Sequence, residues 1–165
     1  MILAGSCSNA TRGQVERHRA SHPTLRIEVA DVMSGKVGPE TILAFAAQNP
    51  GRAPLAYSSS TPEQVKEAQD LWGREAVAGK LDDLFAEAAR RLVEGGVRRL
   101  VVAGGETSGA VVGALGLQSL AIGPEIDPGV PALSSTERPL ALALKSGNFG
   151  APDFFEKALA TLGAA

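Results

Sequence analysis

The sequence predicts an α/β domain: a three-layer arrangement in which a mostly parallel sheet carries helices on both faces. Apolar runs alternate with helical patterns along the chain, and short glycine-rich turns follow several of the apolar runs. Strands and helices that alternate through short connections favour right-handed crossovers and a parallel sheet. At 165 residues, of which 44% are hydrophobic, the chain suits one domain over residues 1–165.

Composition excludes several classes of protein. The formal net charge is -2 and the 16 basic residues are spread along the chain, so no basic stripe is available to neutralise a nucleic-acid backbone. No apolar run reaches the roughly 20 residues of a membrane span, and no signal segment is recognisable. The single cysteine excludes an internal disulfide. We therefore expect a cytoplasmic protein whose partners include neither nucleic acid nor membrane.

The first third of the chain predicts three strands and two helices. Residues 1–4 form an apolar strand, and residues 9–21 show a weakly apolar helical spacing. Residues 25–29 alternate apolar and polar side chains, as in a half-buried strand. Pro39 opens a helix because proline is favoured in the first turn. Residues 53–59 are the next short strand.

Helices are predicted between residues 61 and 96. The Thr61–Pro62 pair, with Gln64 three residues after the threonine, is a helix start of the capping-box type. Gly79 divides two apolar faces, which predicts one helix before it and another after it. The Gly95–Gly96 pair ends the second helix, where a left-handed residue is favoured.

The last third returns to the strand–loop–helix pattern. Residues 98–105 are a continuous apolar run, typical of a buried parallel strand, and a helix follows. Residues 139–145 form another strand, and Pro152 starts the last helix. The stretch "IGPEIDPGVP" (122–131) is interpreted as an ordered loop whose Glu125 and Asp127 either hold a ligand or belong to a rigid crossover between strands.

Three of the predicted strands end in loops of small residues: "AGSCSNAT", "AGGETSGA" and "LKSGNFG". In an open parallel sheet, ligands bind outside the carboxyl ends of the strands. Hydroxyls, exposed amides and helix N-termini there favour anionic oxygens, which predicts a phosphate cradle. Such residues are also ordinary N-caps and turn residues. No standard nucleotide signature is present, since Ala110 stands where a Walker A loop requires lysine.

Cys7 raises a different hypothesis, a hydrolase that uses Ser6 or Cys7 as nucleophile. His18 and His22 follow at a distance, but they lie on the helix that leaves the loop and are expected to point away from it. No base is therefore placed beside the nucleophile, and we expect Cys7 to be a small buried side chain.

Four segments together resemble one known family. "AGSCSNATRGQ", "VVAGGETSGAVV", "GPEIDPGVP" and "LALKSGNFG" occur in this order and span essentially the whole chain. They are similar to the C-terminal nucleotide-binding domain of the four-carbon acid sugar kinases, which phosphorylate threonate, erythronate or 3-oxo-tetronate. The resemblance implies an α/β domain that holds ATP with Mg²⁺, and transfer of the γ-phosphoryl group to the terminal hydroxyl, giving a 4-phosphate.

The resemblance also implies which residues contact the nucleotide. Serine in the first motif, the "GGET" run and a glycine of the last motif match the family's binding positions. Glu106 can orient magnesium through water or bond a ribose hydroxyl, and no residue is assigned as a direct metal ligand. Position alone adds Ser108, Lys145 and Asn148, with the lysine ammonium offsetting phosphate charge. The implied binding residues are Ser6, Ser8, Gly104, Gly105, Glu106, Thr107 and Gly147.

The chain departs from the family by lacking the N-terminal domain that holds the sugar acid. The catalytic base is expected in that domain, so the chain alone is expected to be inactive. An expressed fragment, one subunit of a split enzyme and a truncated remnant all fit. The alternative function is a non-catalytic regulatory module that binds nucleotide or phosphate, and a homo-oligomer is compatible with either.

Overall fold

The computed structural model describes residues 1–58 and 62–163. Its strands are β1 (Ile2–Ala4), β2 (Thr24–Arg26), β3 (Leu55–Tyr57), β4 (Arg99–Ala103), β5 (Leu120–Asp127), β6 (Val130–Ser135) and β7 (Ala141–Lys145). Its helices are α1 (Asn9–Arg19), α2 (Val29–Met33), α3 (Pro39–Gln48), α4 (Pro62–Trp72), α5 (Arg74–Glu94), α6 (Gly105–Leu115) and α7 (Phe154–Gly163).

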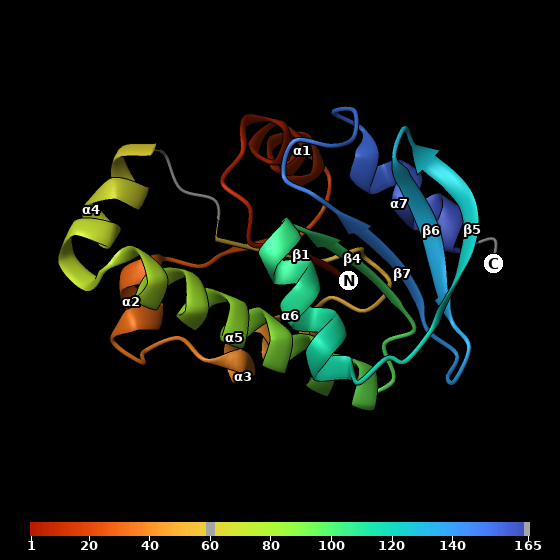
Figure 1. Cartoon of the computed structure of the whole chain (residues 1–165), viewed down its shortest axis with the longest axis horizontal. Coiled ribbons are helices and arrows are strands. Elements are labelled where there is room, and N and C mark those ends of the chain that lie inside the picture. Colours follow the sequence, from red (N-terminus) through yellow and green to blue (C-terminus); the bar gives the residue numbers. More distant parts are fainter. Residues whose placement is uncertain (59–61, 164–165) are drawn as a thin grey trace.

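Within the described residues, the strands form one seven-stranded sheet in the order β2-β3-β1-β4-β7-β6-β5. The five strands from β2 to β7 in this order pair in parallel. β6 and β5 continue the sheet in antiparallel pairing. The prediction of a mostly parallel α/β sheet is confirmed (Figure 1).

Helices cover both faces of the sheet. Successive side chains of a strand point to opposite faces, so Leu3 and Val102 join the core beneath α5 and α6, whereas Ile2 and Val101 join the core beneath α1 and α7. All four side chains have no solvent exposure. Burial on both faces explains why these strands read as continuous apolar runs. Figure 1 shows α5 and α6 in front of the sheet and α7 behind it.

The stretch 122–131 is a correction to the sequence analysis. It is neither a loop nor a crossover, because it forms most of the antiparallel hairpin of β5 and β6. Glu125 accepts a hydrogen bond from the Gly129 amide across the turn at 2.8 Å. Asp127 is buried and accepts from the Ala151 amide and from the Lys157 ammonium, both at 2.9 Å. Glu125 thus holds the turn of the hairpin, and Asp127 ties the hairpin to α7 and to the segment before it.

Two helix boundaries also differ from the prediction. α2 occupies a segment that the sequence analysis left without a helix. The break between α4 and α5 lies at Gly73, whose φ of 84° favours glycine, and α5 continues through Gly79. Thr61, the predicted cap of α4, lies outside the described residues. No helix in the described ranges is long and apolar enough to cross a membrane.

The strand order creates a crevice between β1 and β4. The chain leaves β1 through α1 toward β2 at one edge, and it leaves β4 through α6 toward β5 at the other. Adjacent parallel strands whose connections diverge form a topological switch point, where α/β domains bind ligands at the carboxyl ends of the strands. β7 lies beside β4, so its carboxyl end opens onto the same edge.

Candidate nucleotide site

The three small-residue loops meet at this edge of the sheet. The amides of Gly5 and Ser6 both donate to the carbonyl of Ala103, at 3.0 and 3.2 Å. The amide of Gly104 donates to the carbonyl of Lys145 at 2.9 Å. Backbone hydrogen bonds therefore tie the loop after β1 to the end of β4, and the loop after β4 to the end of β7.

Glycines are required where the loops touch. A Cβ atom on Gly5 would collide with Oγ1 of Thr107, and one on Gly147 would lie 2.5 Å from Oγ of Ser6. Gly104 has a φ of 135°, a conformation that other residues rarely adopt. Gly105 begins α6 beside Ser146. Backbone approaches this close bring predicted residues from all three loops into one site.

Ser8 caps a helix and also joins two of the loops. It is the N-cap of α1, where its Oγ accepts from the Thr11 amide at 3.2 Å. The same hydroxyl donates to the carbonyl of Gly147 at 2.5 Å. Ser6 lies above this contact, and its Oγ accepts from the Ser8 amide at 3.2 Å. The serines thus join the loop after β1 to the loop after β7, in which Asn148 is exposed.

Lys145, the last residue of β7, is a buried lysine. The side chain is only 1% exposed. Its Nζ donates to Oγ1 of Thr11 at 2.8 Å, and to the carbonyls of Ser146 and Gly147 at 3.1 and 3.0 Å. Burial lowers the pKa of Lys145 to about 8. Lys145 therefore lies beneath the loops, where its ammonium is occupied by one hydroxyl and two carbonyls of the protein.

The "GGET" segment begins α6. Its N-cap is Gly104, so Thr107 does not cap the helix and instead donates to Oδ1 of Asp82 on α5 at 2.9 Å. Glu106 is exposed in the first turn. Ser108 is buried, and its Oγ has no hydrogen-bond partner within the described residues. The segment therefore presents one carboxylate outward and uses its threonine to contact a second.

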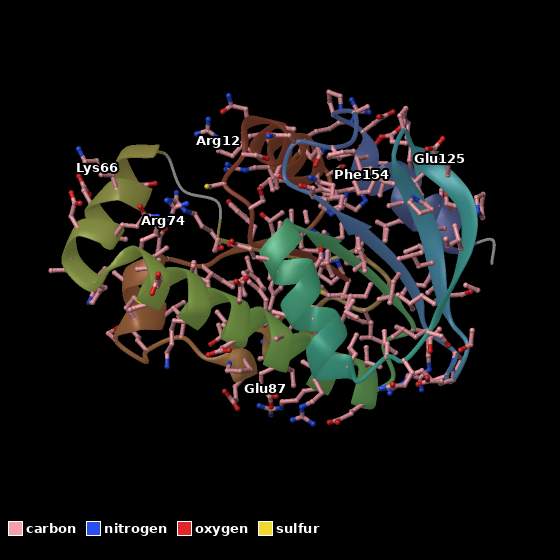
Figure 2. All side chains as sticks on the ribbon, viewed as in Figure 1. Arg12, Lys66, Arg74, Glu87, Glu125 and Phe154 are labelled. Carbon is pink, nitrogen blue, oxygen red and sulfur yellow. The ribbon has the colours of Figure 1, made fainter. Side chains whose placement is uncertain are left out.

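A pocket of about 210 Å³ adjoins the loops on the α5 side. Gly5, Cys7, Asp82 and Glu106 contribute to its lining, and so does Arg74 from the first turn of α5. Figure 2 labels Arg74 at the junction of α4 and α5, and Arg12 on α1. Burial is the main cause that raises the pKa of Asp82, and the charge of Glu106 adds to it.

Sequence analysis missed Asp82, Arg74 and Thr11. Asp82 and Arg74 lie on a long amphipathic helix, where charged residues normally face solvent. Thr11 lies three residues into α1 and is fully buried. Nothing in the spacing of these residues distinguishes them from ordinary helix positions, because their role arises from the docking of α5 and α1 against the loops.

Cys7 is exposed, so the expectation of a buried cysteine is wrong. His18 is buried on α1, and its Nε2 lies 2.8 Å from the carbonyl of Ala53. α1 begins at Asn9, so His18 lies nine residues along the helix, about 14 Å at 1.5 Å per residue from the end that follows Cys7. His18 therefore points away from the loop after β1, as predicted. Among the described residues, no histidine lies beside Ser6 or Cys7 to act as the base of a hydrolase.

The fold and the site together define an α/β domain in which three glycine-rich loops meet at a topological switch point. Over residues 1–155, the chain matches the model of the family described as the nucleotide-binding C-terminal domain, and it belongs to that family. This result confirms the resemblance found in the sequence.

Relatives from bacteria carry a more specific name. The chain is 53% identical to a 3-oxo-tetronate kinase of Pseudomonas savastanoi. The match covers all of this chain and 39% of that protein. It is 49% identical to a 3-oxo-tetronate kinase of Burkholderia multivorans, over 98% of the chain and 38% of that protein. The chain therefore spans well under half of the length of these relatives.

A solved structure has nearly the same fold. The crystal structure of a Haemophilus influenzae protein superposes with a TM-score of 0.93 at 36% identity. The match covers 98% of this chain and 40% of that protein. The two domains therefore share their arrangement of strands and helices, and that protein also extends well beyond the matched region.

Proposed function

We propose that this chain is the ATP-binding half of a kinase that phosphorylates a four-carbon sugar acid. The observation that carries the proposal is the meeting of three loops at the switch point in a domain about 50% identical to 3-oxo-tetronate kinases. The reaction transfers the γ-phosphoryl group of ATP to the terminal hydroxyl of 3-oxo-tetronate, threonate or erythronate, and yields the 4-phosphate.

The nucleotide phosphates lie over the cradle formed by the three loops. Ser6 provides a hydroxyl, Gly104 and Gly105 allow close approach of the backbone, and the N-terminus of α6 favours negative charge. Phosphoryl transfer depends mainly on positioning and on stabilisation of charge. A rigid cradle built from loops suits that chemistry without a covalent intermediate.

The pocket beside the cradle has a donor set that fits Mg²⁺. Magnesium is commonly held by one or two carboxylates together with waters and substrate phosphates, and Asp82 and Glu106 both line the pocket. The described residues contain no group of three or more metal-ligating side chains, so nucleotide oxygens complete the set. When bound, Mg²⁺ neutralises charge on the transferred phosphoryl group. Arg74 lines the same pocket and binds anionic oxygen.

The sugar acid and the catalytic base belong to a separate domain. The relatives are more than twice as long as this chain, which supports that division. The chain alone is therefore expected to bind nucleotide and to lack kinase activity. Formation of a homo-oligomer stays a prediction.

Calorimetry with Mg-ATP and Mg-ADP tests nucleotide binding. We expect saturable binding by the folded chain at submillimolar concentration. The absence of binding up to millimolar nucleotide, with the chain shown to be folded by circular dichroism, contradicts the proposal.

Reconstitution tests the activity. Adding the separately expressed sugar-binding domain of a relative, with 3-oxo-tetronate, threonate or erythronate, is expected to produce ADP and a 4-phosphate. Nucleotide binding without ADP production under any of these combinations favours the non-catalytic regulatory module.

A further inference from the structure

We propose that Lys145 is a positioning residue of the nucleotide site, which fixes the loop after β1 against the loop after β7 and contributes positive charge from beneath the cradle. The inference rests on the proposed nucleotide binding and deepens it. Lys145 touches no ligand in this arrangement, and its effect passes through Thr11 and Gly147.

The carbonyl of Gly147 is the centre of the arrangement. It accepts from Nζ of Lys145 at 3.0 Å, from Oγ1 of Thr11 at 2.9 Å and from Oγ of Ser8 at 2.5 Å. The three donors come from the end of β7, from α1 and from the loop after β1. One carbonyl oxygen therefore joins three separate segments of the site.

Hydrogen-bond directions in this cluster are mutually consistent. Lys145 has three protons and three acceptors: Oγ1 of Thr11 and the carbonyls of Ser146 and Gly147. The Thr11 hydroxyl accepts from Lys145, so its own proton is available for the Gly147 carbonyl. Only the charged ammonium supplies all three protons. A neutral amine has only two protons, so at least one of these three contacts is lost when Lys145 gives up a proton.

The buried position of the Lys145 ammonium also strengthens its attraction for a bound anion. The side chain has 1% exposure, and its Nζ lies 6.0 Å from the centre of the Phe154 ring. Figure 2 labels Phe154 at the start of α7. A charge surrounded by protein is screened much less than one at the surface. The ammonium therefore attracts an anion above Gly147 more strongly than an exposed lysine at the same distance.

Other charged groups on the surrounding elements do not neutralise Lys145. On α1, Arg12 donates to Oδ1 of Asn9. On α7, Lys157 pairs with Asp127 and Asp153. On α6, Glu106 lines the pocket at the α5 side. Cys7, in the loop after β1, is exposed.

Protonation of Lys145 and binding of the anionic nucleotide favour each other, so the affinity for nucleotide depends on pH. Burial lowers the pKa of Lys145 to about 8, and an anion on the cradle favours the ammonium, so it raises that pKa. The contribution of Lys145 to nucleotide affinity is therefore constant at pH values well below 8 and weakens as the pH rises through 8. The largest loss is about tenfold for each pH unit, since the ammonium fraction falls by that factor.

The experiment measures the dissociation constant of ADP from pH 6.5 to 9.5 for the unchanged chain, for Lys145→Met and, as a control, for Lys36→Met. Lys36 is exposed and pairs with Asp31. Methionine keeps the length of the lysine stem and removes its charge.

We expect Lys145→Met to weaken ADP binding about tenfold at pH 7. The gap should close as the pH approaches 9.5, because the parent loses its ammonium there and the methionine variant has none. The Lys36→Met variant should follow the parent throughout. A merely structural role of Lys145 would weaken binding by the same factor at every pH, and that result overturns the proposal.

The parent alone provides a second measurement if Lys145→Met does not fold. Affinity that changes less than twofold between pH 7 and 9 overturns the role of Lys145, while binding at pH 7 leaves the proposed function intact. Absence of ADP binding at pH 7 overturns the proposed function and this inference together. The two failures are therefore distinguishable.

Discussion

The two sides of the crevice are built differently. On the β7 side, Ser8, Thr11 and Lys145 all donate to the carbonyl of Gly147, so this side is closed by its own hydrogen bonds. On the α5 side, Asp82 and Glu106 line an open pocket. The first side has its geometry before any ligand arrives, whereas the second exposes polar groups that a ligand can use.

The difference indicates that the β7 side fixes the geometry of the site and that the α5 side supplies its charge. A preorganised scaffold lowers the entropic cost of binding because less must be ordered when the ligand arrives. Charged groups at an open pocket add attraction for metal and phosphate. We therefore expect changes on the β7 side to act through loop geometry and stability, and changes on the α5 side to act through charge.

Gly5→Ala has the largest expected effect because Gly5 lines the pocket and lies against the first turn of α6. The new Cβ would collide with Oγ1 of Thr107, which is itself bonded to Asp82. Overpacking of this kind costs about 1–3 kcal/mol of unfolding free energy. We also expect at least tenfold weaker nucleotide binding. Chemical denaturation and calorimetry measure the two effects.

Gly109→Ala is the matched control for that change. It lies on the same helix as Thr107, and a Cβ there meets no atom within 4 Å. Alanine in place of glycine inside a helix stabilises by up to about 1 kcal/mol. Equal behaviour of the two variants would show that the loop contact at Gly5 is unimportant.

Asp82→Asn tests the charge of the α5 side. The amide keeps an oxygen that can accept from Thr107, but it loses the negative charge. We expect about tenfold weaker binding of Mg-ADP, and equal or tighter binding of ADP in the presence of a chelator. The ratio of the two dissociation constants isolates the metal, so an unchanged ratio would argue against Asp82 as a magnesium ligand.

The same variant carries a stability prediction. The folded pKa of Asp82 is raised, mainly by burial, so this carboxyl stabilises the fold at low pH. That contribution is lost as the pH rises through the folded pKa. At pH 7 the neutral asparagine avoids the cost of burying a charge. Asp82→Asn should therefore be at least as stable as the parent at pH 7, as measured by urea denaturation.

Much of the fold was predictable because the central strands are buried on both faces. The runs at residues 1–4 and 98–105 are continuous and apolar, and glycine loops follow them. The β5–β6 hairpin was missed since β5 is an edge strand that contains Gly123 and Pro124, and most of its residues are exposed. Burial, which produces the apolar pattern, is absent there.

The candidate site was predictable only in part. Loops at strand ends are visible in the sequence, so Ser6, Ser8 and the "GGET" segment could be proposed. Their partners could not be, because Thr11 and Asp82 reach the site through helix docking. The burial of Lys145 was likewise hidden, since a lysine at the end of a strand usually reaches solvent.

Separate substitutions of Ser6 and Ser8 distinguish effects on stability from effects on nucleotide binding. Ser8→Ala removes an N-cap and the donor to Gly147, so we expect a loss of about 1 kcal/mol in unfolding free energy. Ser6→Ala should change stability less and weaken nucleotide binding several-fold. Thermal denaturation and calorimetry on both variants check this separation, and equal stability losses would contradict it.

Protection of Cys7 is the smallest expected effect and the most direct probe of the open side. The thiol is the only cysteine of the chain, it is exposed, and it lines the pocket. Bound Mg-ADP should therefore slow its reaction with a thiol-specific reagent several-fold, without any substitution in the site. The closed β7 side has no such reporter, so protection of Cys7 means that the ligand reaches the α5 side. If calorimetry detects binding and Cys7 reacts at an unchanged rate, the ligand occupies the cradle alone, and the pocket carboxylates have no part in holding it.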